Sequence, residues 1–142
     1  MECTVKWDGE ARFLANTSSG HEIRMEGAGD LGGQNQAPRP MELILAGAGG
    51  CTAYDVVLIL KRGRHAVTAC EVRMSAERAE TDPKVFTRIH YHYVVSGQKL
   101  KAEVVERAIK LSADKYCSAS IMLGKTAEIT HDFEILEIPS PD

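Results

Sequence analysis

The sequence predicts a mixed α+β fold in which the elements follow the order βββ-α-ββ-αα-β. Short runs separated by turn residues begin the chain, an apolar segment of helical length comes next, and two long alternating stretches follow it. The chain has 142 residues, the length of one domain, so residues 1–142 are interpreted as a single domain. A hydrophobic fraction of 44% and a charged fraction of 26% are typical of a soluble globular protein.

The N-terminal third is predicted to form a three-stranded meander. Its strands are residues 2–7, 11–16 and 21–26. Residues 8–10 and 17–20 separate these strands, and both contain a glycine in a cluster of polar turn residues. Residues 27–40, rich in Gly, Gln, Asn and Pro, show no periodicity and are predicted to be a mobile loop.

A long helix is predicted from Pro40, which suits a first helical turn, to Arg62, which is followed by Gly63 as a natural end. The segment is apolar nearly all round, so we expect burial on most sides. It is long enough to raise the question of a membrane span, but Asp55 within it favours a buried core helix. Residues 46–50 include three glycines, each of which costs about 1 kcal/mol in a helix relative to alanine. We expect the close approach of another backbone, such as a second copy of this helix, to offset that cost.

The second half of the chain is predicted to contain two long antiparallel strands, residues 67–79 and 85–96, each with one solvent-facing side. The apolar face of the first strand carries Thr68, Cys70, Val72, Met74 and Ala76, and that of the second carries Ile89, Tyr91, Tyr93 and Val95. Two helical segments, residues 100–112 and 116–123, and a last strand, residues 127–138, complete the chain.

Charge and composition argue against two classes of partner. The net charge is −3, no basic stripe is present, and the aromatic residues are scattered, so nucleic-acid binding is not expected. Charged residues stand at the N-terminus where a leader peptide would need an apolar run. We therefore expect a cytoplasmic protein that does not act at a membrane.

The cysteines, which are Cys3, Cys51, Cys70 and Cys117, show no C-x-x-C spacing. This argues against a zinc ribbon and against a thioredoxin-type motif, and we expect neither a metal nor an organic cofactor. In a reducing cytosol a disulfide framework is also not expected. The cysteines are therefore either inert core residues or reactive thiols, and Cys70, in line with apolar strand residues, fits the core.

Cys51 and Cys117 are the two cysteines with features of reactive thiols. Asp55 lies one turn after Cys51 on the same helix face, and a carboxylate in an apolar helix needs a partner. An arginine that pairs with Asp55 would also lower the pKa of the Cys51 thiol. Cys117 begins a short helix, whose dipole favours a thiolate. The alternative for both is a small buried core residue.

Two further patterns are weaker. Residues 45–53, with Glu71 downstream, are similar to a dinucleotide-binding fingerprint, but Thr52 occupies the third glycine position and the following strands alternate as antiparallel strands do. His90 and His92 lie on one strand face within range of a shared metal, yet no third ligand is placed by spacing. A solvent-facing pair is the favoured interpretation of these histidines.

Two motifs resemble those of the OsmC/Ohr superfamily. Residues 40–51 resemble its central-helix motif, which ends in a cysteine, and residues 115–118 (Lys-Tyr-Cys-Ser) resemble its second cysteine motif. The separation of Cys51 from Cys117 and the order of elements also match. The resemblance covers nearly the whole chain and is closest to the YhfA-like branch.

The resemblance implies an OsmC-like fold in an intertwined homodimer, whose long central helices are clasped between antiparallel sheets. It implies a thiol peroxidase that reduces organic hydroperoxides in oxidative-stress defence. Cys51 would be the peroxidatic thiolate, and Cys117 the resolving thiol that forms a disulfide with it. An external dithiol would reduce that disulfide. The alternative is the same dimer as a non-catalytic or redox-sensing protein that binds an apolar small molecule at its interface.

The sequence departs from the peroxidase pattern around the first cysteine. Met41 stands where the hydroperoxide-specific branch has a catalytic glutamate, and Glu42 follows one residue later. Glu42 precedes Cys51 by nine residues, which places it about 180° away around a regular helix. Arg12 is the nearest candidate for the family's activating arginine. We hypothesise that Asp55 together with Arg12 replaces the family's Glu–Arg pair.

Overall fold

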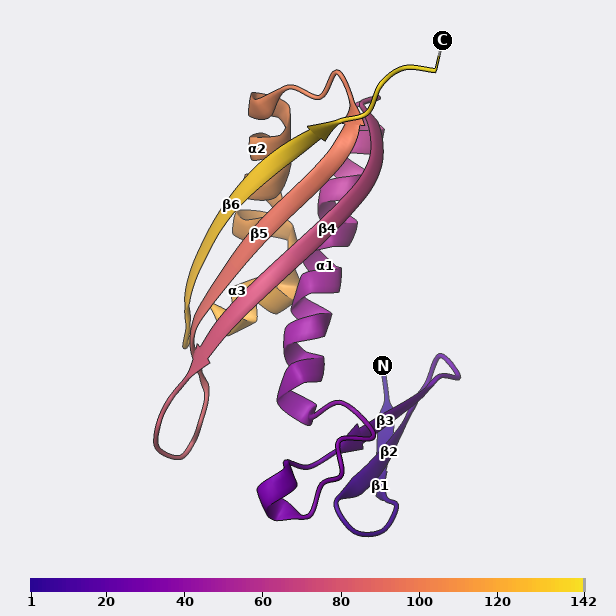
Figure 1. Cartoon of the computed structure of the whole chain (residues 1–142), viewed down its shortest axis with the longest axis vertical. Helices are drawn as coiled ribbons and strands as arrows, with labels where there is room; N and C mark the ends of the chain where they lie inside the picture. Colours follow the sequence, from indigo (N-terminus) through magenta and orange to yellow (C-terminus); the bar gives the residue numbers. More distant parts are fainter. Residues whose placement is uncertain (142) are drawn as a thin grey trace. The chain divides into compact units, whose positions relative to one another are not determined.

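The computed structural model describes residues 1–141 and has the predicted α+β architecture, with two three-stranded sheets (Figure 1). The chain divides into two compact units, Met1–Ala46 and Gly47–Asp142. The long helix α1, Pro40–Arg62, begins in the first unit and continues in the second. The predicted order of strands and helices is confirmed, whereas the single-domain interpretation stays a prediction.

The N-terminal unit is the predicted meander. Its strands are β1 (Cys3–Trp7), β2 (Arg12–Thr17) and β3 (Glu22–Glu26), which pair antiparallel in this order. Gly9 and Gly20 adopt positive φ angles of 85° and 88° in the two turns. A side chain there would be strained, which explains why the predicted turns contain glycine.

The loop after β3 is anchored by a buried carboxylate. It contains a short 3₁₀ turn, Gly29–Leu31. Glu26 is 2% exposed and accepts hydrogen bonds from the backbone N–H groups of Gln34 at 2.5 Å and Gln36 at 2.7 Å. These two bonds are the main reason why the pKa of Glu26 lies below its usual value. This anchor has no local sequence signal, because it links residues eight and ten positions apart in a segment without periodicity.

The C-terminal unit contains a second sheet, with β5 (Phe86–Gln98) in the centre. On one side β4 (Ala66–Arg78) pairs with it antiparallel, and on the other side β6 (Glu128–Glu137) pairs with it parallel. A parallel neighbour needs a crossover connection. The crossover contains α2 (Ala102–Leu111), the π-helical turn η2 (Ser112–Tyr116) and α3 (Ser118–Leu123). Within this unit the helices cover one face of the sheet (Figure 1).

The core of this unit lies between the inner face of β5 and the helices. Ile89 and Val95 of β5, Val56 and Leu60 of α1, and Ile109 of α2 are fully buried. Burying such side chains contributes about 1.5–3 kcal/mol each. Two positions predicted for the apolar face of β4 are wrong, since Thr68 and Ala76 are exposed. At Thr68 the reason is a register shift between Val67 and Ala69, which turns Val67 inward instead.

The prediction that α1 is buried on most sides is wrong for the single chain. Its buried residues form one stripe, which consists of Ala48, Gly49, Thr52, Val56 and Leu60. A Cβ atom on Gly49 would lie 2.6 Å from the sulfur of Met74, so this glycine permits close packing against β4. Gly47 and Gly50 face open space. The chain's own sheet therefore explains one of the three helical glycines.

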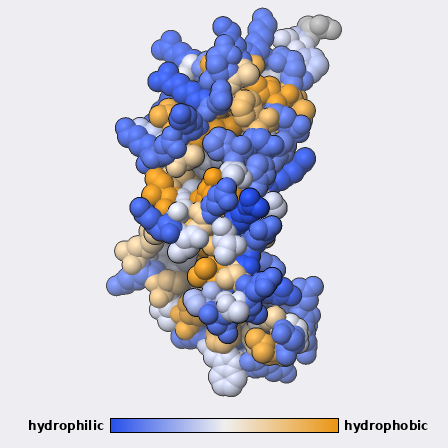
Figure 2. Space-filling model, turned by 90° about the vertical axis from the view of Figure 1, so that its left-hand side faces the viewer, coloured by the Kyte–Doolittle hydropathy of each residue, from blue (hydrophilic) through white to orange (hydrophobic). Residues whose placement is uncertain are grey.

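Among the described residues, α1 alone is long and apolar enough to cross a membrane by length and composition. Core helices of soluble proteins can have the same length and apolar composition. Only 28% of its most apolar window is buried within the chain. On the face drawn in Figure 2, groups of hydrophobic residues lie among hydrophilic ones.

Candidate functional site

The structure brings Cys51, Asp55 and Cys117 together inside the C-terminal unit. The two sulfur atoms and a carboxylate oxygen all lie within 4.8 Å of one another. Cys51 and Asp55 stand one turn apart on α1, and Cys117 lies in the crossover between η2 and α3. The cysteine pair suggested by the sequence motifs is therefore a pair in space.

An irregular backbone places Cys117. The chain leaves α2 through the π-helical turn and becomes extended at Cys117, with φ −75° and ψ 93°. Cys117 is the N-cap of α3, and its sulfur accepts a hydrogen bond from the Ser120 N–H at 3.4 Å. The predicted helix start at this cysteine is thus confirmed. Single π-helical turns occur often at functional sites.

The two thiols differ in burial. Cys117 is 0% exposed, and burial raises the pKa of its thiol, with a smaller opposing effect from Ser120. Burial therefore opposes the thiolate that the helix dipole was expected to favour at Cys117. The Cys117 thiol donates to the Ser120 hydroxyl at 3.0 Å. Cys51 is only half-buried and is the more accessible sulfur.

A chain of buried hydroxyl groups supports Asp55. Its Oδ2 accepts a hydrogen bond from the Ser112 hydroxyl at 2.9 Å. The Ser112 oxygen is also 2.8 Å from that of Thr52, which in turn is 2.7 Å from the Tyr93 hydroxyl. Among the described residues of the C-terminal unit, no arginine or lysine forms an ion pair with Asp55. In this unit its partner is a hydroxyl group.

The hydroxyl chain links α1, η2 and β5 without any formal charge besides Asp55. Burial raises the pKa of Tyr93 to about 12, so this phenol stays neutral. Burial also raises the pKa of Tyr91, whose hydroxyl lies 2.9 Å from that of Ser120 beside Cys117. Thr52, Ser112 and Ser120 are site residues that were not predicted from the sequence. One local signal was available, since Thr52 directly follows Cys51 in the motif.

The other two predicted site residues belong to the N-terminal unit. Arg12 is on β2, directly opposite Glu26 in the strand register, and its buried Nε has no hydrogen-bond partner among the described residues. Glu42 is exposed in the first turn of α1. The catalytic roles suggested for them stay predictions.

A groove begins at Asp55 and has a volume of about 270 Å³. Apolar side chains form most of its wall, together with one cation. Its lining residues are Asp55, Leu58, Ile59, Arg62, Leu111 and Tyr116. An apolar molecule that carries a polar group could therefore reach the carboxylate from this side.

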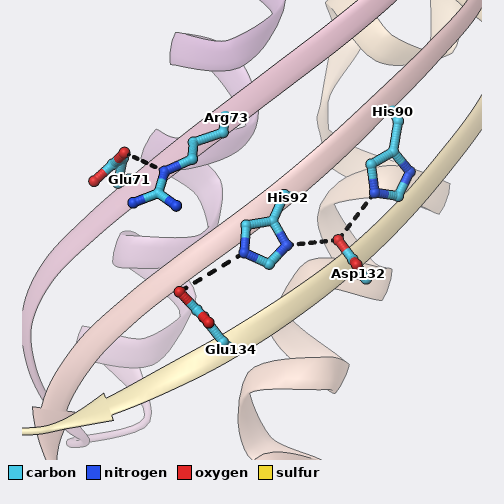
Figure 3. A network of polar contacts seen from close by, with 6 residues as sticks. All are labelled: Glu71, Arg73, His90, His92, Asp132 and Glu134. Atoms are coloured by element: carbon cyan, nitrogen blue, oxygen red, sulfur yellow. Dashed lines mark hydrogen bonds and ion pairs between the residues drawn. The ribbon is translucent and has the colours of Figure 1, made fainter.

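A second polar cluster lies on the opposite face of the same sheet (Figure 3). Oδ1 of Asp132 is 2.9 Å from Nε2 of His90 and 2.7 Å from Nδ1 of His92. The predicted solvent-facing histidine pair is confirmed, since the His90 side chain is 41% exposed. The sequence spacing offered no carboxylate, whereas the parallel pairing of β5 with β6 places Asp132 directly opposite His92.

Comparison with known proteins identifies relatives over nearly the whole chain. A family model described as "OsmC-like protein" matches residues 33–132. Protein YhfA of Escherichia coli strain K12 is 47% identical over 137 residues, which cover 96% of this chain and 98% of that protein. The structure is similar to that of a hypothetical protein from Aquifex aeolicus VF5, with a TM-score of 0.84 and 33% identity over 97% of each chain.

A more distant structural neighbour has a name that refers to peroxide chemistry. It is described as an organic hydroperoxide resistance protein OsmC, a predicted redox protein, from Legionella pneumophila. Its TM-score is 0.71 at 16% identity, over 94% of this chain and 96% of that chain. At this identity the similarity shows a shared fold.

Proposed function

We propose, given that this chain belongs to the OsmC-like protein family, that it is a cysteine-based peroxidase that reduces organic hydroperoxides. The observation that carries the proposal is the pair of thiols at Cys51 and Cys117, whose sulfur atoms lie within 4.8 Å of each other. Peroxide-resistance proteins among the neighbours of the same fold support this chemistry.

The reaction would proceed in two steps. The Cys51 thiolate attacks the hydroperoxide, so that an S–O bond forms and the O–O bond breaks. Cys51 becomes a sulfenic acid, and the leaving alkoxide takes up a proton to give the alcohol. The Cys117 thiol then attacks the Cys51 sulfur, which forms the disulfide and releases water. An external dithiol returns both cysteines to thiols and is itself oxidised to a disulfide.

Burial supports the proposed assignment of the two roles. The peroxidatic thiol must meet the substrate, and Cys51 is the half-buried member of the pair. A resolving thiol needs only to reach the sulfenic acid. Cys117 is fully buried, and burial raises the pKa of its thiol.

Asp55 is proposed to orient the thiol pair and the incoming hydroperoxide. Its carboxylate is held by Ser112 and faces the groove beside α1. The combination of Asp55 with Arg12 as a replacement for the family's Glu–Arg pair remains part of this proposal. A peroxidase rate that is unchanged in Asp55→Asn would remove Asp55 from the mechanism.

A homodimer in the cytoplasm is proposed as the working form. Along α1, Ile44 is 47% exposed and Tyr54 is 67% exposed, and Gly47 and Gly50 face open space. An exposed apolar helix face of this kind is typical of a surface that packs against a partner. A second copy of α1 supplies an apolar surface of matching character, and the small residues permit close approach.

The first test is a peptide mass map under non-reducing conditions after one equivalent of tert-butyl hydroperoxide. We expect a Cys51–Cys117 disulfide, with Cys3 and Cys70 still free. Cys70→Ser is the matched control, since Cys70 is also half-buried but lies outside the site. An unmodified Cys51 thiol after this treatment would contradict the peroxidase.

A second candidate function is the binding of an apolar molecule by the same dimer, with the cysteines as sensing thiols. A cavity of about 460 Å³ between α1 and α2 favours it, because Ile59, Val104 and Leu111 form much of its wall. In that case an apolar fluorescent probe would bind, and the hydroperoxide would be consumed no faster than by the Cys51→Ser variant.

A further inference from the structure

The donor atoms of Cys51, Asp55 and Cys117 have the spacing of a metal site. Zinc binds thiolate sulfur at about 2.3 Å and carboxylate oxygen at about 2.0–2.2 Å. Two sulfur ligands on one tetrahedral zinc ion are therefore about 3.8 Å apart. The three donor atoms here lie within 4.8 Å of one another, so side-chain shifts of less than about 1 Å would bring them into ligand geometry.

The groups behind these donors already fix their orientation. Ser112 holds one oxygen of Asp55 at 2.9 Å and is itself hydrogen-bonded to the buried Thr52 hydroxyl. The Ser120 N–H points at the Cys117 sulfur, a contact that favours a thiolate. Metal ligands are commonly oriented by such outer hydrogen bonds.

The donor set selects the type of cation. Two thiolates favour Zn²⁺ over Mg²⁺ or Ca²⁺, which prefer oxygen ligands. Three protein ligands leave the fourth tetrahedral position for water, as in zinc sites that are not purely structural. Cys51 and Asp55 are both partly exposed, so an ion can enter from their side while Cys117 closes the site from within.

We propose that the reduced protein binds one Zn²⁺ ion per chain through Cys51, Asp55 and Cys117. Binding displaces the protons of both thiols. The inference goes beyond the peroxidase and stands on the donor geometry alone. Only the redox consequence of zinc binding rests on the proposed function. In that reaction one hydroperoxide and two protons would react with the zinc-bound dithiolate. The products would be the disulfide, the alcohol, water and free Zn²⁺. Zinc and the disulfide therefore exclude each other at this site.

The test uses Co²⁺ as a spectroscopic probe for the zinc site. The full-length protein is reduced, freed of metal with a chelator and titrated anaerobically. We expect one Co²⁺ per chain, with a thiolate-to-cobalt charge-transfer band and the visible bands of tetrahedral cobalt. Zn²⁺ should then displace the cobalt. A titration without a charge-transfer band would overturn the proposal.

Variants identify the ligands. Cys51→Ser and Cys117→Ser should each weaken Co²⁺ binding by about 100-fold and reduce the charge-transfer band, and the double variant should abolish the band. Ser112→Ala, which removes the hydroxyl that holds Asp55, should weaken binding by about 10-fold. Asp55→Asn is the conservative variant, and it should weaken Co²⁺ binding while the circular dichroism spectrum stays unchanged. Cys70→Ser and a His90→Ala/His92→Ala double variant are the controls and should bind as the parent does. Binding that depends on the histidines and survives loss of both site cysteines would contradict the assignment.

Wild-type protein oxidised with diamide gives a test that needs no variant. Its disulfide has no thiolate to offer, so the cobalt spectrum should be absent and should return after reduction. This experiment contains no hydroperoxide. A failed peroxidase assay would therefore not contradict the zinc site, and a failed cobalt titration would not contradict the peroxidase.

Discussion

The two faces of strand β5 carry polar networks of opposite character. Facing the helices, Tyr91 and Tyr93 are 1% and 2% exposed, and each hydroxyl meets another buried hydroxyl. Facing solvent, His90 and His92 share the exposed carboxylate of Asp132 (Figure 3). The hydrogen-bond lengths are similar on both faces. The two faces differ in what happens when a hydrogen bond is lost. On the outer face water can take the place of the missing partner, whereas on the buried face no other group can.

This difference determines which network the protein depends on. A buried donor or acceptor that loses its partner carries the full cost of its lost solvation. An exposed ion pair is screened and contributes little. The inner hydrogen bonds also end at Asp55 and at Cys117, so they contact the candidate site directly. The outer network reaches no group of the candidate site.

The largest effect is expected for Ser112→Ala. This change removes the hydroxyl that donates to Asp55 and leaves a partly buried carboxylate without its partner. We expect a loss of about 3 kcal/mol in the free energy of unfolding, together with slower disulfide formation after hydroperoxide. Urea unfolding measures the first and the peptide map the second. A stability within 0.5 kcal/mol of wild type, roughly the scatter of surface substitutions, would contradict the importance of the inner network.

An intermediate effect is expected for Thr52→Val, with Thr130→Val as its outer-face counterpart. Both substitutions remove a hydroxyl and keep the side-chain shape. Thr52 has two buried hydroxyl partners, whereas Thr130 meets only the exposed His90 ring at 2.7 Å. Thr52→Val should lower the free energy of unfolding by about 1–3 kcal/mol. Thr130→Val should change it by less than about 0.5 kcal/mol. An equal loss of unfolding free energy in the two variants would show that burial does not determine how much each hydroxyl group contributes to stability.

The smallest effect is expected on the outer face and depends on pH. His92 and His90 hold the pKa of Asp132 below its ordinary value of 3.8. Because the folded-state pKa is the lower one, this contribution to stability is present above the ordinary value and is lost as the pH falls through the folded-state pKa. Asp132→Asn should therefore give a slightly flatter dependence of the melting temperature on pH in the acidic range. Identical slopes in both proteins would indicate that this cluster contributes nothing.

Local patterns are sufficient to predict most of the elements. The alternation of Tyr91 and Tyr93 with His90 and His92 identifies β5 and its two faces, because a strand's side-chain period of two depends only on the strand itself. The same holds for α1, where Pro40 and Gly63 indicate the two ends. The family resemblance of the motifs at Cys51 and Cys117 indicates the pair of thiols.

Predictions that depend on distant parts of the chain are less successful. Thr68 is assigned to the wrong face because a register shift arises only when two strands pair. The expected thiolate at Cys117 follows from the helix dipole, but the burial that opposes it comes from packing. In the C-terminal unit Asp55 meets Ser112, which is 57 residues further along the chain and has no recognisable motif.

The sequence by itself determined the order of the elements, the two faces of β5 and the identity of the two thiols, because periodicity and motifs are properties of neighbouring residues. Only the tertiary structure decided which thiol is buried, which hydroxyl groups hold Asp55 and which carboxylate lies between the two histidines. These are distances between elements. They are determined by how the crossover after β5 returns the chain to the sheet, and no local pattern encodes that path.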